Sequence, residues 1–399
     1  MRRRRRRKRW ARILMLILVL LCGVLGIVYG MKMGKIKTNF MESTKEIPYQ
    51  EEAVKSDTQT GKYYYGLLNE EEQKIYREIF SGVDENTEEI YVYASDADLV
   101  NRLFQYVVKD HPEIFWCDGT ATATSYSGVE SYTVLKPEYQ HNPEERTQMQ
   151  SEIDAAVSEC LSGISSDASD YEKILYVYEY LVNQVEYDMD APENQNIYSA
   201  FVKKASVCAG YSKATQYLLE KSGVFCTYVT GTTTDGQSHA WNLVKCEGDY
   251  CYVDTTWGDP LFLASEGEQV SDEEKITYDY MCCDDTELLK THIPDTDVTL
   301  PSCTSMDWNY YVVNHMYHTD YDGEEILQQM NDIISQKSNP MVIKFANSEL
   351  YEADHEDIFS NLIPRAAKNL ADWYGVSEVK YQYLDEAELN KITIFWRYE

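Results

Sequence analysis

The stretch that decides the fold lies at residues 207–223 and reads VCAGYSKATQYLLEKSG. It predicts a helix that opens at Cys208 and stops at Gly223, a residue type typical of the position just after a helix. Free backbone N–H groups and the positive end of the helix dipole stabilise a thiolate in the first turn. Gly210 is expected to leave room for the close approach of a substrate chain. We therefore predict that Cys208 is a nucleophile.

Three strands are predicted after this helix, at residues 224–230, 239–246 and 250–256. A turn centred on Glu247-Gly248 pairs the last two strands so that His239 and Asp254 share one face as diagonal neighbours, with Cα atoms roughly 7–8 Å apart. A turn one residue later would separate them. Only the first register lets Asp254 orient His239 and lets His239 deprotonate Cys208.

Each of these three residues has a commoner structural role when it is taken alone. A single Cys in a helix is usually a small buried apolar residue, a His on a strand is usually a satisfied polar residue, and an Asp before Thr-Thr usually caps a strand. Their combination, at a helix start and on paired strands, predicts a Cys–His–Asp triad.

Three blocks carry a family resemblance: Val-Cys-Ala-Gly-Tyr at 207–211, His-Ala-Trp-Asn at 239–242 and Val-Asp-Thr-Thr-Trp at 253–257. They resemble the signature blocks of the transglutaminase-like superfamily, over about residues 170–260. The resemblance implies an α+β fold with a papain-like core, in which a nucleophile helix packs on an antiparallel sheet. It also implies that Cys208 is the nucleophile, His239 the base and Asp254 the orienting acid. Asp-His-Pro-Glu at 110–113 is similar to segments that precede this domain in exported bacterial members.

The family contains amide-crosslinking enzymes, peptidases and members that have lost the triad. We therefore expect an acyltransferase or amidohydrolase that attacks a glutamine carboxamide or a peptide bond through a Cys208 thioester, with a protein or peptide substrate, for example in the cell envelope. The alternatives are a cysteine peptidase of the same fold, or a non-catalytic module that binds peptide or cell wall. No cofactor is predicted.

The N-terminus predicts a membrane anchor. Nine basic residues fall within positions 1–12, and residues 13–31 form a 19-residue stretch without charge. That length suits one helix across a bilayer core of roughly 30 Å. The basic cluster favours a single-pass location in the cell membrane, with a cytoplasmic N-terminus and an extracellular body. A cleaved signal peptide is the competing interpretation.

The chain is expected to have several parts, and its small flanking modules are predicted from alternating helical and strand patterns. The predicted organisation is a cytoplasmic basic segment (1–12), a transmembrane helix (13–31), a linker (32–62), an N-terminal α/β domain (63–165), a transglutaminase-like catalytic domain (166–300) and a C-terminal α/β module (301–399). Within the N-terminal domain, residues 113–116 are predicted as a strand.

Charge and cysteine content limit other functions. The whole chain has a net charge of −31 and no acidic residue before Glu42, so the body is still more acidic and would repel nucleic acid. The ten cysteines leave disulfides and free thiols equally open. No metal site is predicted, because Cys282, Cys283, His292 and Cys303 lack the spacing of a zinc site. Residues 320–323 lack the flanking ligands of a calcium loop.

Overall fold

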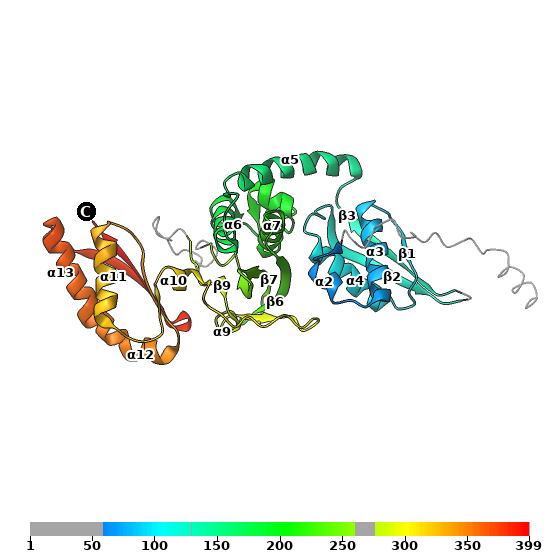
Figure 1. Cartoon of the computed structure of the whole chain (residues 1–399). Helices are drawn as coiled ribbons and strands as arrows, with labels where there is room; N and C mark the ends of the chain where they lie inside the picture. The colour runs from blue at the N-terminus through cyan, green and yellow to red at the C-terminus, as the bar shows by residue number, and fades with distance from the viewer. Residues whose placement is uncertain (1–58, 129, 260–275, 399) are drawn as a thin grey trace, which may run out of the picture. The chain divides into compact units, whose positions relative to one another are not determined.

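The computed structural model describes residues 59–128, 130–259 and 276–398. Within these residues, helices and mainly antiparallel sheets alternate in an α+β arrangement, which confirms the predicted fold class (Figure 1). The described residues contain a three-stranded sheet (β1-β3-β2), a five-stranded sheet (β10-β6-β7-β8-β9), a four-stranded sheet (β11-β12-β14-β13) and a parallel pair (β4-β5).

Side-chain caps fix where the first helices begin. Asn69 accepts hydrogen bonds from two backbone N–H groups at the start of α3, and Asp96 does the same for α4. This region comprises α2 (Tyr63–Gly66), α3 (Glu70–Asp84), β1 (Ile90–Val92), α4 (Ala97–Asp110), β2 (Cys117–Tyr126) and β3 (Tyr132–Tyr139). The predicted strand at 113–116 is wrong. These residues are a turn that follows α4, and their apolar side chains are buried there without sheet pairing.

The Asp-His-Pro-Glu segment ends α4 and ties it to α2. The Asp110 carboxylate accepts hydrogen bonds from the backbone N–H groups of Tyr64 and Tyr65, at 3.0 and 2.8 Å. His111 bonds through one ring nitrogen to Glu113 at 2.8 Å. In the described residues these contacts give the segment a structural role.

In the central part, helix α7 packs against the five-stranded sheet. Strands β6 to β8 form an antiparallel meander, and α7 packs on β6 and β7. The elements are α5 (Pro143–Leu161), α6 (Asp170–Gln184), β4 (Glu186–Tyr187), the π-helical turn Ser199–Lys203, β5 (Ala205–Ser206), α7 (Cys208–Lys221), β6 (Cys226–Thr233), β7 (Ser238–Cys246), β8 (Asp249–Val253), β9 (Met281–Cys283), α9 (Asp285–Leu288) and β10 (His292–Pro294).

After the short helix α10, the C-terminal part runs strand, helix, strand, helices, strand, strand. It comprises α10 (Tyr310–Val313), β11 (Tyr317–His318), α11 (Gly323–Ser335), β12 (Met341–Phe345), α12 (Ser348–Asp357), the π-helical turn Ile358–Leu362, α13 (Ile363–Tyr374), β13 (Lys380–Glu386), the 3₁₀ turn Ala387–Leu389 and β14 (Lys391–Arg397). Helices α11 and α13 pack on each other and share an apolar core with the sheet.

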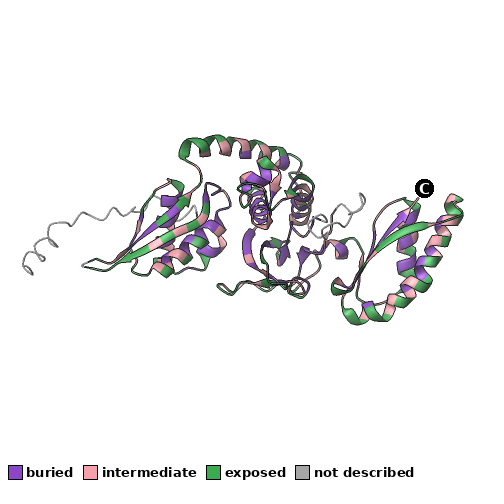
Figure 2. Ribbon diagram, turned by 180° about the vertical axis from the view of Figure 1, so that it is seen from behind, coloured by how far each residue is buried: buried purple, intermediate pink, exposed green. Residues whose placement is uncertain are grey.

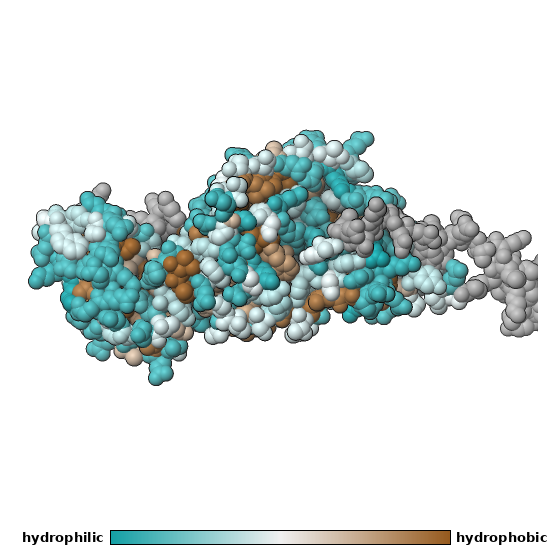
Figure 3. All heavy atoms as spheres, viewed as in Figure 1, coloured by the Kyte–Doolittle hydropathy of each residue, from teal (hydrophilic) through white to brown (hydrophobic). Residues whose placement is uncertain are grey.

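Burial follows the amphipathic patterns of these elements. Figure 2 shows buried residues on the inward sides of the helices and along the central strands, whereas α5 is exposed along much of its length. The face seen in Figure 3 is mostly hydrophilic, with apolar residues in small separate patches. This surface agrees with the acidic composition of the chain.

The predicted location in the cell membrane is contradicted. Among the described residues, none of the helices combines the length and the apolar character that crossing a bilayer requires. The predicted cytoplasmic segment (1–12), transmembrane helix (13–31) and most of the linker (32–62) lie outside the described residues. We therefore withdraw the single-pass location and the topology that went with it.

Candidate active site

Cys208 is the first residue of α7, as the sequence predicts. The preceding residue, Val207, has an extended backbone, and its side chain makes no capping hydrogen bond. Cys208 is partly accessible, whereas the other eight described cysteines are buried free thiols. An accessible thiol at an uncapped helix N-terminus has the backbone N–H groups and dipole that favour an anion.

Gly210 serves a different purpose from the predicted one. A Cβ atom at this position would lie 1.9 Å from the Ser206 hydroxyl oxygen and 3.1 Å from the carbonyl oxygens of Asn194 and Asn196. The missing side chain therefore admits the protein's own preceding loop, not a substrate chain. The loop is further fixed by the Ser206 hydroxyl, which donates to the Asn194 carbonyl at 2.7 Å.

The hairpin of β7 and β8 has the predicted register. Asn242 pairs with Val253 and Cys246 pairs with Asp249, around a turn at Glu247-Gly248. Both turn residues have positive φ, as a two-residue hairpin turn requires. Asp254 lies one residue past the end of β8, where its backbone N–H donates to the Tyr280 carbonyl at 3.0 Å.

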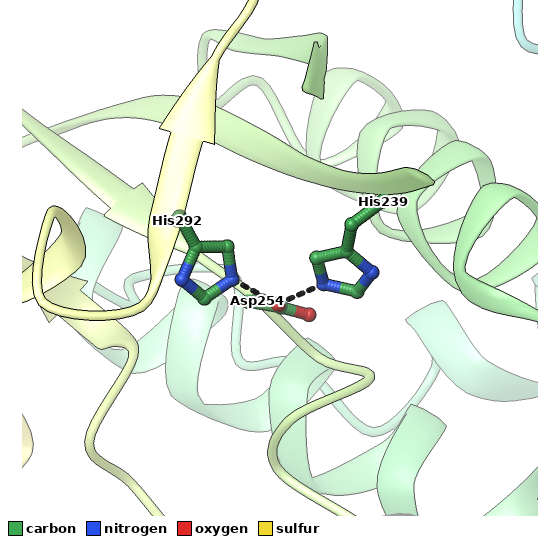
Figure 4. A group of neighbouring side chains, drawn as sticks. All are labelled: His239, Asp254 and His292. Atoms are coloured by element: carbon green, nitrogen blue, oxygen red, sulfur yellow. Dashed lines mark hydrogen bonds and ion pairs between the residues drawn. The ribbon is translucent and has the colours of Figure 1, made fainter. Parts of the chain in front are cut away.

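The hairpin brings His239 and Asp254 into direct contact. His239 Nε2 lies 2.6 Å from Asp254 Oδ2, and both side chains are buried (Figure 4). The His239 ring also makes a hydrogen bond with the Cys208 side chain. The structure thus brings together the three residues that the sequence singles out.

The electrostatics of this group favour an imidazolium. Burial alone would lower the pKa of His239, but the Asp254 carboxylate and the Cys208 side chain outweigh it and raise that pKa to about 10. Burial alone would raise the pKa of Asp254, but His239 and His292 hold it well below its usual range. A permanently ionised Asp254 can stabilise a cationic His239 beside an anionic sulfur.

His292 is a member of this site that sequence reasoning missed. Its Nε2 lies 3.0 Å from Asp254 Oδ2, and the ring is completely buried. Figure 4 shows the two imidazoles on either side of the carboxylate, His239 from β7 and His292 from β10. No sequence signal marks His292, because β10 is a short strand that reaches the sheet by pairing with β6.

Among the described residues, His239, Asp254 and His292 form a group that offers ligand atoms for a metal ion. Their side-chain nitrogen and oxygen atoms lie within 4.8 Å of one another. Tetrahedral zinc ligands would be separated by about 3.3 Å, given metal–ligand distances near 2.0 Å. The observed separations of 2.6 and 3.0 Å are hydrogen-bond lengths instead. The geometry therefore fits a hydrogen-bonded cluster, and no metal is assigned to it.

Among the described residues, the four residues considered for zinc from the sequence, Cys282, Cys283, His292 and Cys303, form no common ligand group. His292 faces Asp254, whereas the Cys282 thiol contacts Cys246 and Cys251. The acidic turn at 320–323 precedes a helix, where the Asp322 side chain accepts backbone hydrogen bonds from Glu324 and Glu325.

The residues around this site have the arrangement of a transglutaminase-like core, with Cys208, His239 and Asp254 in contact. Residues 158–255 match the family model of the transglutaminase-like superfamily, which confirms the resemblance seen in the sequence. The chain is similar to the kyphoscoliosis peptidase of Mus musculus, with 28% identity over 127 residues, and to that of Homo sapiens, with 27% over 125 residues. Each match covers 27% of this chain and about a fifth (19%) of the relative.

A solved structure described as a TGase is also similar to the chain. It has 14% sequence identity and a TM-score of 0.27, and the match covers 46% of this chain and 54% of the other. At this TM-score the likeness carries no argument of its own.

Proposed function

We propose that this chain is a cysteine enzyme that attacks a carboxamide or peptide carbonyl through Cys208. The observation that carries the proposal is the contact of one imidazole with both partners: His239 bonds to Asp254 through Nε2 and also to the Cys208 side chain. This arrangement matches the nucleophile, base and orienting acid of a triad.

The reaction begins with the Cys208 thiolate attacking the carbonyl carbon. A carbon–sulfur bond forms, and the tetrahedral intermediate collapses as the carbon–nitrogen bond breaks. His239 gives its proton to the departing amine or ammonia, which leaves an acyl-thioester on Cys208. The free N–H groups at the start of α7 are suited to stabilise the intermediate's oxyanion.

Either water or an amine can complete the reaction. Water yields hydrolysis, whereas an amine acceptor yields transfer or crosslinking, and both regenerate the thiol. The name of the curated relatives, a peptidase, favours hydrolysis of a protein or peptide substrate as the second candidate. A non-catalytic binding role would not require the contact between Cys208, His239 and Asp254.

The test combines thiol labelling with product analysis. The protein is incubated with a peptide library and a tagged amine, and mass spectrometry reports transfer, deamidation or cleavage. Cys208→Ala should abolish every product and the formation of an acyl-enzyme. Cys226→Ala is the matched control, because burial raises the pKa of the Cys226 thiol well above its usual value. Activity that survives Cys208→Ala would refute the proposal.

A further inference from the structure

A chain of hydrogen bonds extends from the active site through His292. His292 Nε2 lies 3.0 Å from Asp254 Oδ2, and its Nδ1 lies 2.8 Å from the Thr291 hydroxyl. That hydroxyl lies 2.6 Å from the Tyr280 hydroxyl. Both nitrogens of this fully buried ring therefore have partners.

The chemistry of the carboxylate settles the direction of these bonds. Asp254 is ionised and can only accept, so His239 and His292 must both donate through Nε2. On the other side of the ring, Nδ1 of His292 contacts the Thr291 hydroxyl, which contacts the Tyr280 hydroxyl in turn. The same rule assigns Nε2 of His239 to Asp254 and leaves Nδ1 as the ring nitrogen for the hydrogen bond with Cys208.

Four donors surround the Asp254 carboxylate. Oδ1 accepts from the backbone N–H groups of Thr256 and Trp257, at 2.9 and 3.2 Å. Oδ2 accepts from His239 and His292. A buried carboxylate that loses one donor must turn or recruit another, because an unpaired buried charge is costly. The donor from His292 thus helps to hold Oδ2 where His239 needs it.

We propose that His292 is a positioning residue, which fixes the Asp254 carboxylate and through it the orientation of His239 toward Cys208. The inference rests on the proposed function, since it concerns the same triad. The competing role for His292 is packing, because its ring centroid lies 4.8–4.9 Å from those of Trp241, Trp257 and Tyr280.

Two substitutions separate positioning from packing. His292→Phe keeps an aromatic ring among its neighbours and removes the donor. His292→Gln keeps an N–H donor and removes the ring. The measurement is the rate of iodoacetamide alkylation at Cys208, followed by mass spectrometry of its peptide between pH 5 and 9, with thermal unfolding of each variant as the fold check.

Positioning predicts that His292→Phe lowers the neutral-pH rate about tenfold, as expected for a lost bond to a charged group, while His292→Gln retains most of it. A rate for His292→Phe equal to or above that of His292→Gln would overturn the inference. Should His292→Phe fail to fold, Thr291→Val takes its place. It removes the hydroxyl that contacts Nδ1 of His292 and should lower the rate, whereas an unchanged rate would count against positioning.

The reactivity of Cys208 in the wild-type protein distinguishes failure of this inference from failure of the proposed function. If wild-type Cys208 reacts no faster at neutral pH than a thiol in the urea-unfolded chain, the triad itself fails and the inference falls with it. If wild-type Cys208 is reactive but both His292 variants match it, only the positioning role is wrong.

Discussion

The side-chain amide of Asn242 donates a hydrogen bond to the backbone carbonyl of Ser212 at 3.0 Å. Asn242 belongs to β7, the strand that carries His239, and Ser212 belongs to α7, the helix that begins at Cys208. A second, longer bond of 3.4 Å reaches the Thr227 carbonyl on β6. One buried amide thus joins the strand that carries His239 to the helix that begins at Cys208.

Asn242→Ala should therefore lower stability more than it lowers catalysis. Loss of the amide removes one donor from each of two buried carbonyls, which we expect to cost about 1–3 kcal/mol of unfolding free energy. The side chain is absent from the bonds that Asp254 accepts, so the alkylation rate of Cys208 should change little. Urea unfolding and the alkylation assay measure the two effects. A large rate loss at unchanged stability would instead place Asn242 within the triad.

Asp254→Asn should disable the site without removing volume. All four bonds to this carboxylate come from N–H donors, so the amide's NH₂ must face two of them wherever it points. By analogy with other triads, the reaction rate should fall by about 10²–10⁴-fold.

The pH dependence of alkylation gives a second readout for Asp254→Asn. The carboxylate raises the pKa of His239 to about 10, so in the wild type the imidazolium persists through neutral pH and is lost only as the pH approaches that value. Without the charge, the pKa should fall back toward its usual value, and Cys208 should lose its cationic partner near neutrality. An alkylation profile that overlays the wild type would rule out the assigned role of Asp254.

Asp279 should be a large contributor to stability. Its buried carboxylate bonds to two fully buried ammonium groups, Lys344 at 2.8 Å and Lys391 at 2.5 Å. Removing one member of a buried ion pair costs several kcal/mol, so Asp279→Asn should lower the unfolding free energy at pH 7 by about 3 kcal/mol. Asp372→Asn, an exposed position on α13, is the control and should have little effect.

The effect of Asp279→Asn should depend on pH in a defined direction. Burial raises the pKa of Asp279, but the two lysines outweigh it and hold that pKa below its usual range. The stabilisation is therefore complete above the unfolded-state pKa of about 3.9 and is lost as the pH falls below it. Urea unfolding at pH 7 and pH 3 should show a smaller difference at pH 3. An equal difference at both values would contradict the ionic account.

Lys213 should have the opposite effect on stability. Burial lowers the pKa of this ammonium to about 8, and its Nζ lies 5.9 Å from the centre of the Tyr228 ring. The unfolded chain keeps the proton up to about pH 10.4, so the folded state bears a penalty that is full below pH 8 and disappears as the pH rises from 8 to about 10.4.

Lys213→Met should therefore stabilise the protein at pH 7, by at most about 3 kcal/mol, and the gain should shrink by pH 10. Lys368→Met, at an exposed site on α13, controls for the loss of a positive charge from the chain. Urea unfolding at the two pH values decides the matter. A destabilised Lys213→Met would show that the ammonium makes a favourable interaction that burial does not reveal.

The sequence predicts those parts of the site that depend on local geometry. The register of β7 and β8 follows from a two-residue turn at Glu247-Gly248, and helix α7 follows from its apolar pattern and Gly223. Both are short-range features with strong residue preferences. Helices α3 and α4 likewise begin at residue types that commonly cap helices, Asn69 and Asp96.

Long-range contacts account for what the sequence does not predict. His292 reaches Asp254 across 38 positions of chain, through an edge strand of three residues. Gly210 faces the Asn194–Ser206 loop, which no local pattern foretells. Residues 113–116 have the apolar run of a strand, yet they are buried in a turn. In each case tertiary packing, not local propensity, decides the outcome.

The buried charges of Asp279, Lys344 and Lys391 also constrain how this sequence can evolve. The two lysines also pair with Glu287 and Glu386, so replacing any one of the three residues upsets the charge balance of a buried cluster of five side chains. Asp279 and Lys391 are 112 positions apart in the chain, so no single local change can exchange the set. The effect of each substitution therefore depends on the residues at the other positions of the cluster, an epistasis that ties the C-terminal sheet to the segment before β9.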